Sequence, residues 1–236
     1  MPKLIFDIET IGEDFDSLDQ TTQDVLTRWI KKESENEDEY KKELEELKNG
    51  LGFSPLTGEI VVIGVLDEEK DQAVVCFQAP GKTIGEFEED GVKFKQMTEK
   101  EMLLNFWKGA VGYNEFISFN GRGFDVPFLM IRSALYKIKP TKDLMSNRYL
   151  NSQKFSATHI DLMDQLSFYG AVRRKWSLHL WCRLFGIKSP KAEGITGDDV
   201  SRLFKEKKYI DIAKYNVGDL RATRDLYDYW QNYLRF

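Results

Sequence analysis

The chain begins with an apolar segment that two acidic residues interrupt. The apolar positions of residues 2–12, "PKLIFDIETIG", predict a strand buried on both faces. Asp7 and Glu9 lie within this strand, and residues two apart on a strand point to the same face, about 7 Å apart along the chain. Two half-buried carboxylates repel each other and lose solvation, and a divalent cation between them would offset that cost. For this motif alone, the alternative is an exposed strand end at which both acids meet water.

After residue 12, the spacing of apolar residues changes from that of a strand to that of a helix and back again. Two amphipathic helices are expected at 19–32 and 36–48, and the second ends at Asn49-Gly50, because glycine typically follows a helix. Three strands are then expected, at 58–67, 72–79 and 92–97.

The second half of the chain has a mainly helical pattern. A helix is expected to begin at Thr98, because Thr98 and Glu101 form a Thr-x-x-Glu capping pattern. The other expected elements are a strand at 116–120, a helix at 124–137, a short strand or turn before a helix at 159–170, and helices from 176 to the end. Early strands and later helices around one mixed sheet predict a single α/β domain over residues 1–236, with a helical insertion at about 13–55.

The net charge at pH 7 is −5, which is unusual for a protein that binds nucleic acid. Residues 31–48 hold 5 lysines and 8 acidic residues, and the rest of the chain carries 29 basic and 31 acidic residues. The mild acidity therefore does not exclude a phosphodiester substrate. It does argue against a protein whose affinity comes from a broad basic surface.

The cysteines and the apolar runs indicate in which cellular compartment the protein is expected. Cys76 and Cys182 show no CxxC or Cys/His clustering, so they predict reduced, buried thiols and argue against a zinc site. The longest apolar run, residues 60–66, is too short to span a bilayer. We therefore expect a cytoplasmic protein with no membrane partner.

A third acidic residue, Asp125, follows the strand at 116–120 after a short turn, in "SFNGRGFDVPFL". Taken alone, an aspartate at the beginning of a helix is typical of an N-cap. Gly121 and Gly123 suggest a dinucleotide-binding loop, but the third glycine of that pattern would fall at Val126, and this excludes the Rossmann interpretation.

Near the C-terminus, Tyr215 and Asp219 lie on the same face of an expected helix, one turn apart, in "KYNVGDLRATRDLYDY". Gly218 removes bulk beside the aspartate, at a cost in helix propensity of about 1 kcal/mol. Because such Tyr/Asp pairs are common on helices, this motif alone supports no functional conclusion.

Taken together, the three motifs change the interpretation. "FDIET", Asn-x-x-x-Phe-Asp and Tyr-x-x-x-Asp occur in the order of the exonuclease motifs of the DEDD superfamily in its tyrosine form, which the chain resembles. More narrowly, it is similar to the stand-alone predicted exonucleases related to the proofreading domain of family B DNA polymerases. The histidine form of the superfamily is disfavoured, because His159 and His179 both lie far upstream of Asp219.

This resemblance implies an RNase H-like mixed sheet flanked by helices, on which four carboxylates converge. Asp7, Glu9, Asp125 and Asp219 would bind two divalent cations, Mg²⁺ or Mn²⁺, and would serve as catalytic residues together with Tyr215. Oxygen ligands suit these hard cations, and four carboxylates balance the charge of two such ions. Tyr215 would orient the attacking water by hydrogen bonding, since a phenol with an ordinary pKa near 10 is a poor base at neutral pH.

The resemblance also implies that Thr10, Asn120 and Phe124 contact the 3′-terminal nucleotide, although turn capping and core packing explain Asn120 and Phe124 equally well. Asp161 is interpreted as a helix cap. Relative to the polymerase domain, the helical segment within 12–55 is a long addition. It either overhangs the substrate cleft or covers an edge of the sheet.

We therefore expect a two-metal-ion 3′–5′ exonuclease that removes nucleotides from single-stranded or frayed 3′ ends of DNA. One alternative is a 3′–5′ exoribonuclease, and another is a non-catalytic nucleic-acid-binding module on the same fold. The intact set of carboxylates argues against the non-catalytic module. The sequence does not identify a polymerase or repair protein as a partner.

Overall fold

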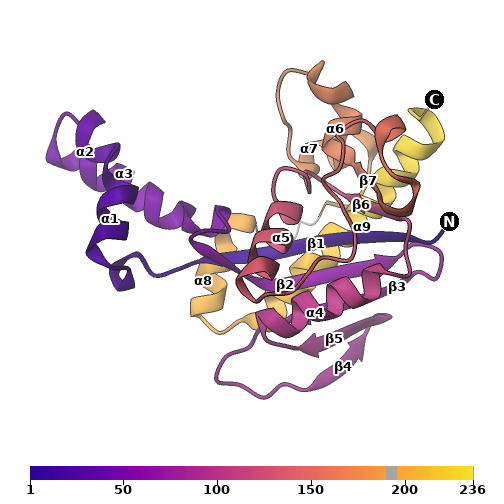
Figure 1. Cartoon of the computed structure of the whole chain (residues 1–236), viewed down its shortest axis with the longest axis horizontal. Coiled ribbons are helices and arrows are strands. Elements are labelled where there is room, and N and C mark those ends of the chain that lie inside the picture. The colour runs from indigo at the N-terminus through magenta and orange to yellow at the C-terminus, as the bar shows by residue number, and fades with distance from the viewer. Residues whose placement is uncertain (190–195, 236) are drawn as a thin grey trace.

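A mixed sheet of seven strands organises the computed structural model, which describes residues 1–189 and 196–235. The strand order is β4-β5-β3-β2-β1-β6-β7, and helices cover both faces (Figure 1). The strands are β1 (Lys3–Gly12), β2 (Gly58–Asp67), β3 (Gln72–Phe77), β4 (Glu86–Glu89), β5 (Val92–Gln96), β6 (Glu115–Ser118) and β7 (Thr158–Asp161). This architecture confirms the predicted α/β class.

The helices agree with the sequence pattern in most places. They are α1 (Gln20–Thr27), α2 (Ile30–Glu33), α3 (Glu37–Gly50), α4 (Glu99–Ala110), α5 (Asp125–Leu135), α6 (Leu162–Leu166), α7 (Leu178–Phe185), α8 (Val200–Lys205) and α9 (Tyr209–Tyr233). The Thr98 capping box is present in full, since the side chain of Thr98 and that of Glu101 each accept from the other residue's backbone N–H.

Three expectations need correction. The edge strand β4 was not predicted, because its sequence "EFEE" offers only one apolar side chain to the sheet. The helix expected at 19–32 is divided into α1 and α2. The helical stretch expected from 176 onward is also interrupted: α7 ends at Gly186, which adopts a left-handed conformation with φ 69°. Part of that stretch, residues 190–195, lies outside the described residues.

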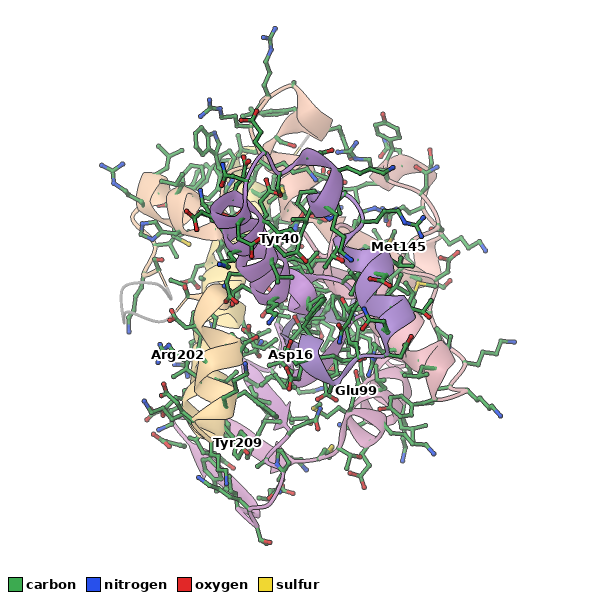
Figure 2. All side chains as sticks on the ribbon, turned by 90° about the vertical axis from the view of Figure 1, so that its left-hand side faces the viewer. Asp16, Tyr40, Glu99, Met145, Arg202 and Tyr209 are labelled. Atoms are coloured by element: carbon green, nitrogen blue, oxygen red, sulfur yellow. The ribbon has the colours of Figure 1, made fainter. Side chains whose placement is uncertain are left out.

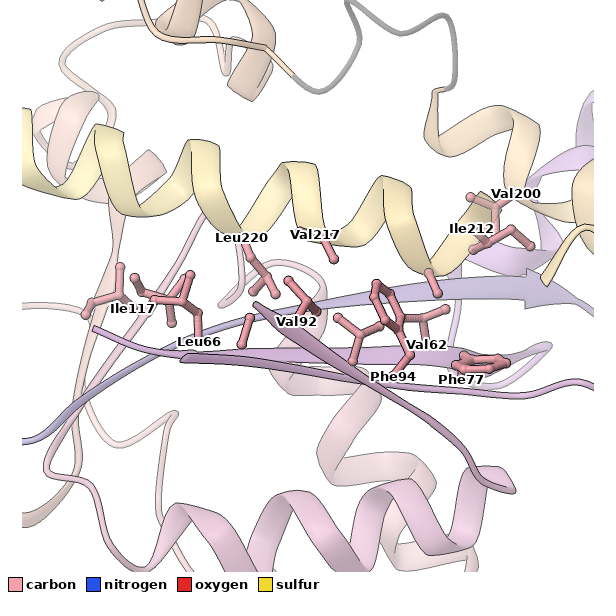
Figure 3. Close-up of a cluster of buried hydrophobic side chains, with 14 of the residues drawn as sticks. Val62, Leu66, Phe77, Val92, Phe94, Ile117, Val200, Ile212, Val217 and Leu220 are labelled. Carbon is pink, nitrogen blue, oxygen red and sulfur yellow. The ribbon is translucent and has the colours of Figure 1, made fainter. Parts of the chain in front are cut away.

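Strand β1 lies inside the sheet, antiparallel to β2 and parallel to β6. Its apolar side chains alternate between two hydrophobic clusters, as expected for a strand buried on both faces. Ile5 packs in the cluster under α9, and Figure 3 shows this helix lying along that face of the sheet. Leu4, Phe6 and Ile8 pack on the other face, in the cluster that α4 and α5 cover.

A buried ion pair fixes α5 relative to α4 and β2. Glu99, which is almost fully buried, accepts from Nε and an Nη of Arg132 at 2.8 and 2.7 Å. It also accepts from the hydroxyl of Tyr136 and from the backbone N–H of Ile60. Such a multiply hydrogen-bonded pair can offset the desolvation of both charges. It therefore helps to place the beginning of α5, where Asp125 lies.

Helices α1 to α3 form an arm that extends past the end of β1 and away from the sheet (Figure 1). Figure 2 views the molecule from the arm's side, with Asp16 and Tyr40 in front of the body. No side chain of α3 is buried. The two roles left open for the insertion both stay predictions. Among the described residues, no helix is both long and apolar enough to cross a membrane.

Candidate active site

The two acidic residues of β1 lie on the strand face that meets α9. Asp7 pairs across the sheet with Gly64, and Glu9 with Val62. The register shifts directly after Glu9, between Glu9 and Thr10, and β-bulges of this kind often re-aim side chains beside active sites. Glu9 is only 6% exposed and Asp7 is half-buried, so this is not the exposed strand end that was the alternative.

Helix α9 brings a third carboxylate to these two. Oxygen atoms of Asp7, Glu9 and Asp219 all lie within 4.8 Å of one another. Asp219 and Tyr215 are one helical turn apart on α9 and both are half-buried. The structure therefore brings together side chains from segments more than 200 residues apart, in a donor set made only of carboxylate oxygens. This set fits a hard divalent cation.

Asp125 lies beside this group but outside the set of three. It is the first residue of α5 and is 3% exposed, and its carboxylate accepts from the backbone N–H of Ile8 at 3.0 Å. That N–H is available because β6 pairs only with residues 3–5 of β1. Asp125 is not the N-cap of its helix, because Phe124 occupies that position.

The electrostatics of the site reflect crowded acidic groups. Burial, followed by the charges of Asp125, Asp219 and Glu9, raises the pKa of Asp7 well above its ordinary value. Burial and the charge of Asp219 have the same effect on the pKa of Glu9. Burial raises the pKa of Asp125 to about 7, although hydrogen bonds from its own N–H and that of Ile8 act in the other direction. Without a cation, full ionisation of this cluster is therefore unfavourable.

Tyr215 remains a neutral phenol in this environment. Burial, followed by the negative charges of Asp219, Glu9 and Asp7, raises its pKa far above the ordinary value. Its hydroxyl hydrogen-bonds to the carboxylate of Asp219. Burial and the neighbouring carboxylates thus disfavour the phenolate, and this environment favours an orienting hydroxyl over a phenolate base.

Asn216 belongs to the site, although the sequence motifs did not identify it. Its Nδ2 donates to Oδ2 of Asp7 at 2.7 Å, and its side chain also hydrogen-bonds to Glu9. The residue is fully buried, and its Oδ1 has no hydrogen-bond partner among the described residues. A Cβ at Gly64 would lie 1.8 Å from this oxygen, so only glycine fits there. The sequence did contain one indication of this role, because Asn216 is a polar residue on the otherwise mainly apolar face of α9.

We predict that Asn216→Ala weakens the binding of Mn²⁺ about 10- to 100-fold, because Asp7 loses the donor that fixes its carboxylate. Titration calorimetry with Mn²⁺ measures this without any substrate. Thr223→Val is the matched control, since Thr223 is also buried on α9, two turns further along, and lies outside the carboxylate cluster. Equal Mn²⁺ affinity in the Asn216 variant and the parent would show that the amide only fills space.

The turn between β6 and α5 is held by Asp161. Its carboxylate accepts from the backbone N–H of Asn120 and of Arg122, both at 2.9 Å, and from that of Met163 at the beginning of α6. The interpretation of Asp161 as a helix cap is thus confirmed, and the same side chain also fixes the turn that precedes Asp125. Asn120 adopts a left-handed conformation with φ 63° in this turn and is half-buried.

The other two residues expected to contact substrate lie next to the end of the arm. Thr10 donates its hydroxyl to the carbonyl of Gly52 at 2.7 Å. Phe124 contacts Phe53, with ring centroids 6.4 Å apart, and also packs against Phe128 in the core. Thr10 and Phe124 line one small cavity together with Glu9, whereas Asn120 is not among the residues that line it.

Comparison with known proteins identifies the fold and the family of the chain. The structure is similar to that of the family B DNA polymerase from the hyperthermophilic archaeon Pyrobaculum calidifontis, with a TM-score of 0.55 and 15% sequence identity. The similarity covers 98% of this chain and 24% of the polymerase, so the chain spans about a quarter of that protein. At this identity the likeness concerns the fold, and the predicted RNase H-like sheet is confirmed. No curated protein matches the chain.

The sequence itself matches the model of one protein family. That family is described as a predicted 3′–5′ exonuclease related to the exonuclease domain of PolB, and the match covers residues 66–235. This range contains Asp125, Tyr215 and Asp219 but begins after the β1 acids, so Asp7 and Glu9 lie outside it. Because most of the chain is matched, it belongs to the family of predicted 3′–5′ exonucleases related to the exonuclease domain of PolB.

Proposed function

We propose that this protein is a divalent-cation-dependent 3′–5′ exonuclease that acts on DNA and prefers single strands. The observation that carries the proposal is the cluster of Asp7, Glu9 and Asp219, with oxygens within 4.8 Å of one another in a largely buried place. Such a cluster is costly without a cation, because the carboxylates repel one another and are poorly solvated. The family of the chain supports nuclease chemistry, and the matched range contains Asp219 of this cluster.

Each residue has a role in this proposal. Asp7, Glu9 and Asp219 would hold Mg²⁺ or Mn²⁺, and Asp125, whose charge acts on Asp7, is the candidate additional ligand for a second ion. Bound there, divalent cations would stabilise the negative charge that develops on the phosphoryl group and on the leaving oxygen. Tyr215 would donate its hydroxyl hydrogen to the Asp219 carboxylate, and its oxygen would accept a hydrogen bond from the attacking water. Water would attack the terminal phosphodiester and lose one proton to solvent, while the bond from phosphorus to the 3′ oxygen of the penultimate nucleotide breaks. That oxygen would take up a proton to become the new 3′-hydroxyl, and a nucleoside 5′-monophosphate would leave.

DNA is the proposed substrate because the similar solved structure is that of a DNA polymerase. Single strands are preferred in the proposal because a 3′ end must separate from its complement to reach buried carboxylates, and unpairing costs free energy.

We predict that the protein shortens a 5′-labelled single-stranded DNA one nucleotide at a time from its 3′ end, and does so only with Mg²⁺ or Mn²⁺. A time course on labelled DNA and RNA, each with Mg²⁺, Mn²⁺ or EDTA, tests polarity, cation dependence and sugar preference together. A strand with a 3′-phosphate is the matched control, because it lacks the terminal hydroxyl and should be cut more slowly.

The outcomes separate the alternatives. Faster shortening of RNA than of DNA would replace the proposal with an exoribonuclease. Binding of both strands without cleavage, under every cation condition, would favour a non-catalytic module. Internal cleavage products would contradict an exonuclease altogether.

A further inference from the structure

The arm ends in a segment that is fixed tightly to β1. The short 3₁₀ helix Leu51–Phe53 follows α3, and a Cβ at Gly12 would lie 2.7 Å from Cβ of Leu51. This close approach requires glycine at position 12. Leu51 is buried, and Thr10 donates to the carbonyl of Gly52. The end of the arm is therefore a fixed part of the site, even though α1 to α3 extend away from the body.

This anchoring leaves the next side chain, Phe53, pointing out of the core. Phe53 is 57% exposed, and its one ring contact within the described structure is with Phe124. Several large apolar side chains of the protein are exposed, and Phe53 differs from them by its place beside Phe124, in the lining of a cavity that Glu9 also lines.

The two rings line a cavity next to the carboxylates. This cavity has a volume of about 90 Å³, and Glu9, Thr10, Gly52 and Ser201 complete its lining with a few neighbours. Ligand pockets usually exceed about 300 Å³, so the cavity holds only part of a nucleotide. The exposed ring of Phe53 extends its apolar wall to the surface. One wall is therefore aromatic, and the other carries polar groups and a candidate cation ligand.

The charge of the arm indicates which part of a nucleotide meets Phe53. Residues 13–50 contain 13 acidic and 6 basic side chains. A net charge of about −7 repels a phosphate backbone, so this side of the cavity does not attract phosphates. An aromatic ring offers stacking to a base or an apolar contact to a sugar, and neither depends on charge.

We propose that the insertion supplies Phe53 to the nuclease site, where it stacks on the base of the 3′-terminal nucleotide and so selects strand ends. This inference rests on the proposed function. It adds Phe53, which directly follows the arm in the chain, to the residues proposed to contact the substrate. The terminal nucleotide lies against Phe53 and Phe124 near Glu9, and the strand leaves on the side away from the acidic arm.

Phe53→Ala tests the proposal by removing the ring from a largely exposed position. With a fluorescent base analogue, 2-aminopurine, at the 3′ terminus of a single-stranded DNA, the parent should quench the emission on binding and the variant should not. The KM of the variant should rise about tenfold, with a smaller change in kcat, because stacking of one base contributes on that scale. Phe53→Trp should restore the quenching and the KM.

Leu56→Ala is the matched control, since Leu56 is exposed on the same segment and contributes nothing to the cavity lining. A second control places 2-aminopurine far from the 3′ end, where Phe53→Ala should change nothing. The binding assay is run in an Asp219→Ala background, so it does not depend on cleavage.

Two results decide the matter. Equal KM and equal terminal quenching in Phe53→Ala and the parent, with the parent shortening DNA normally, would overturn this inference and leave the proposed function intact. Quenching that depends on Phe53 in the Asp219→Ala background, together with a parent protein that hydrolyses no strand, would support the subsite and contradict the nuclease assignment.

Discussion

Asp7→Asn is expected to lower kcat/KM on single-stranded DNA by about 10³-fold or more, because losing a carboxylate ligand removes several kcal/mol of transition-state stabilisation. The replacement is close in shape, and its amide oxygen can still accept from Nδ2 of Asn216, which donates to Asp7 at 2.7 Å in the parent. The loss should therefore come from charge and cation binding, not from a disturbed fold. Single-turnover rates with saturating Mg²⁺ or Mn²⁺ measure it.

The same variant should be more stable than the parent when divalent cations are removed. Burial and neighbouring acids raise the pKa of Asp7 in the folded state above that of the unfolded chain. The folded state then binds more protons, so the stability of the parent falls as pH rises above about 4, until the folded-state group ionises. The neutral amide of the variant carries no such penalty. We expect a gain of about 1 kcal/mol or more near pH 8, or about 2–4 °C in Tm.

Thermal unfolding of the parent and of Asp7→Asn in EDTA at pH 4, 6 and 8 checks the direction of this stability difference. The stability gained by Asp7→Asn should shrink toward pH 4. Asp67→Asn is the control, and its expected effect on stability is opposite to that of Asp7→Asn. Burial alone would raise the pKa of Asp67, but hydrogen bonds from Lys70 and Tyr113 outweigh it and lower the pKa. Asp67→Asn should therefore destabilise the protein at neutral pH without affecting catalysis. A less stable Asp7→Asn protein in EDTA would contradict charge crowding at the site.

The fold was predictable where local sequence and tertiary burial agree. The alternation in β1 and the apolar run of β2 correspond to a strand buried on both faces, and the 3.6-residue period of α9 corresponds to one face on the sheet. The strand β4 could not be predicted in this way. It is held by pairing with β5 and by the stacking of Phe87 on Phe94, and neither contact is visible in four residues of sequence.

In the candidate site too, the sequence did not show the contacts that depend on the folded chain. Motif spacing identified Asp7, Glu9 and Asp219, which the fold does bring together. It did not identify Asn216, because a buried asparagine has a role only once Asp7 is known to lie opposite it. Nor did it show that Asp125 accepts from the N–H of Ile8, since that contact depends on β6 ending early.

The insertion was the least predictable part. Its helical periodicity is clear in the sequence, and α3 ends at Gly50 as expected. The sequence does not show that Gly12 lets Leu51 approach β1 closely enough to place Phe53 beside Phe124. Such contacts join residues about 40 to 70 positions apart, and only the folded chain reveals them.

Tyr215→Phe should lower the single-turnover rate about 10²-fold, a smaller loss than that of Asp7→Asn. The variant keeps the ring and its packing but removes the hydroxyl that hydrogen-bonds to Asp219. Orienting contributions of this kind are typically worth about 10²–10⁴-fold, and the low end applies because Asp219 itself remains. Tyr229→Phe, a partly exposed position on the same helix, is the matched control and should leave the rate unchanged.

The pH profile of that loss distinguishes an orienting phenol from a base. Burial and three nearby carboxylates raise the pKa of Tyr215 far above the ordinary value, and an orienting role requires that the hydroxyl stay protonated from pH 6 to 9. The ratio of parent to variant rates should therefore be constant across this range, and both rates can be followed on a short 5′-labelled strand. A ratio that grows with pH would mean that Tyr215 ionises and acts as a base. A ratio of one at every pH would make Tyr215 a packing residue and would remove the tyrosine from the proposed mechanism.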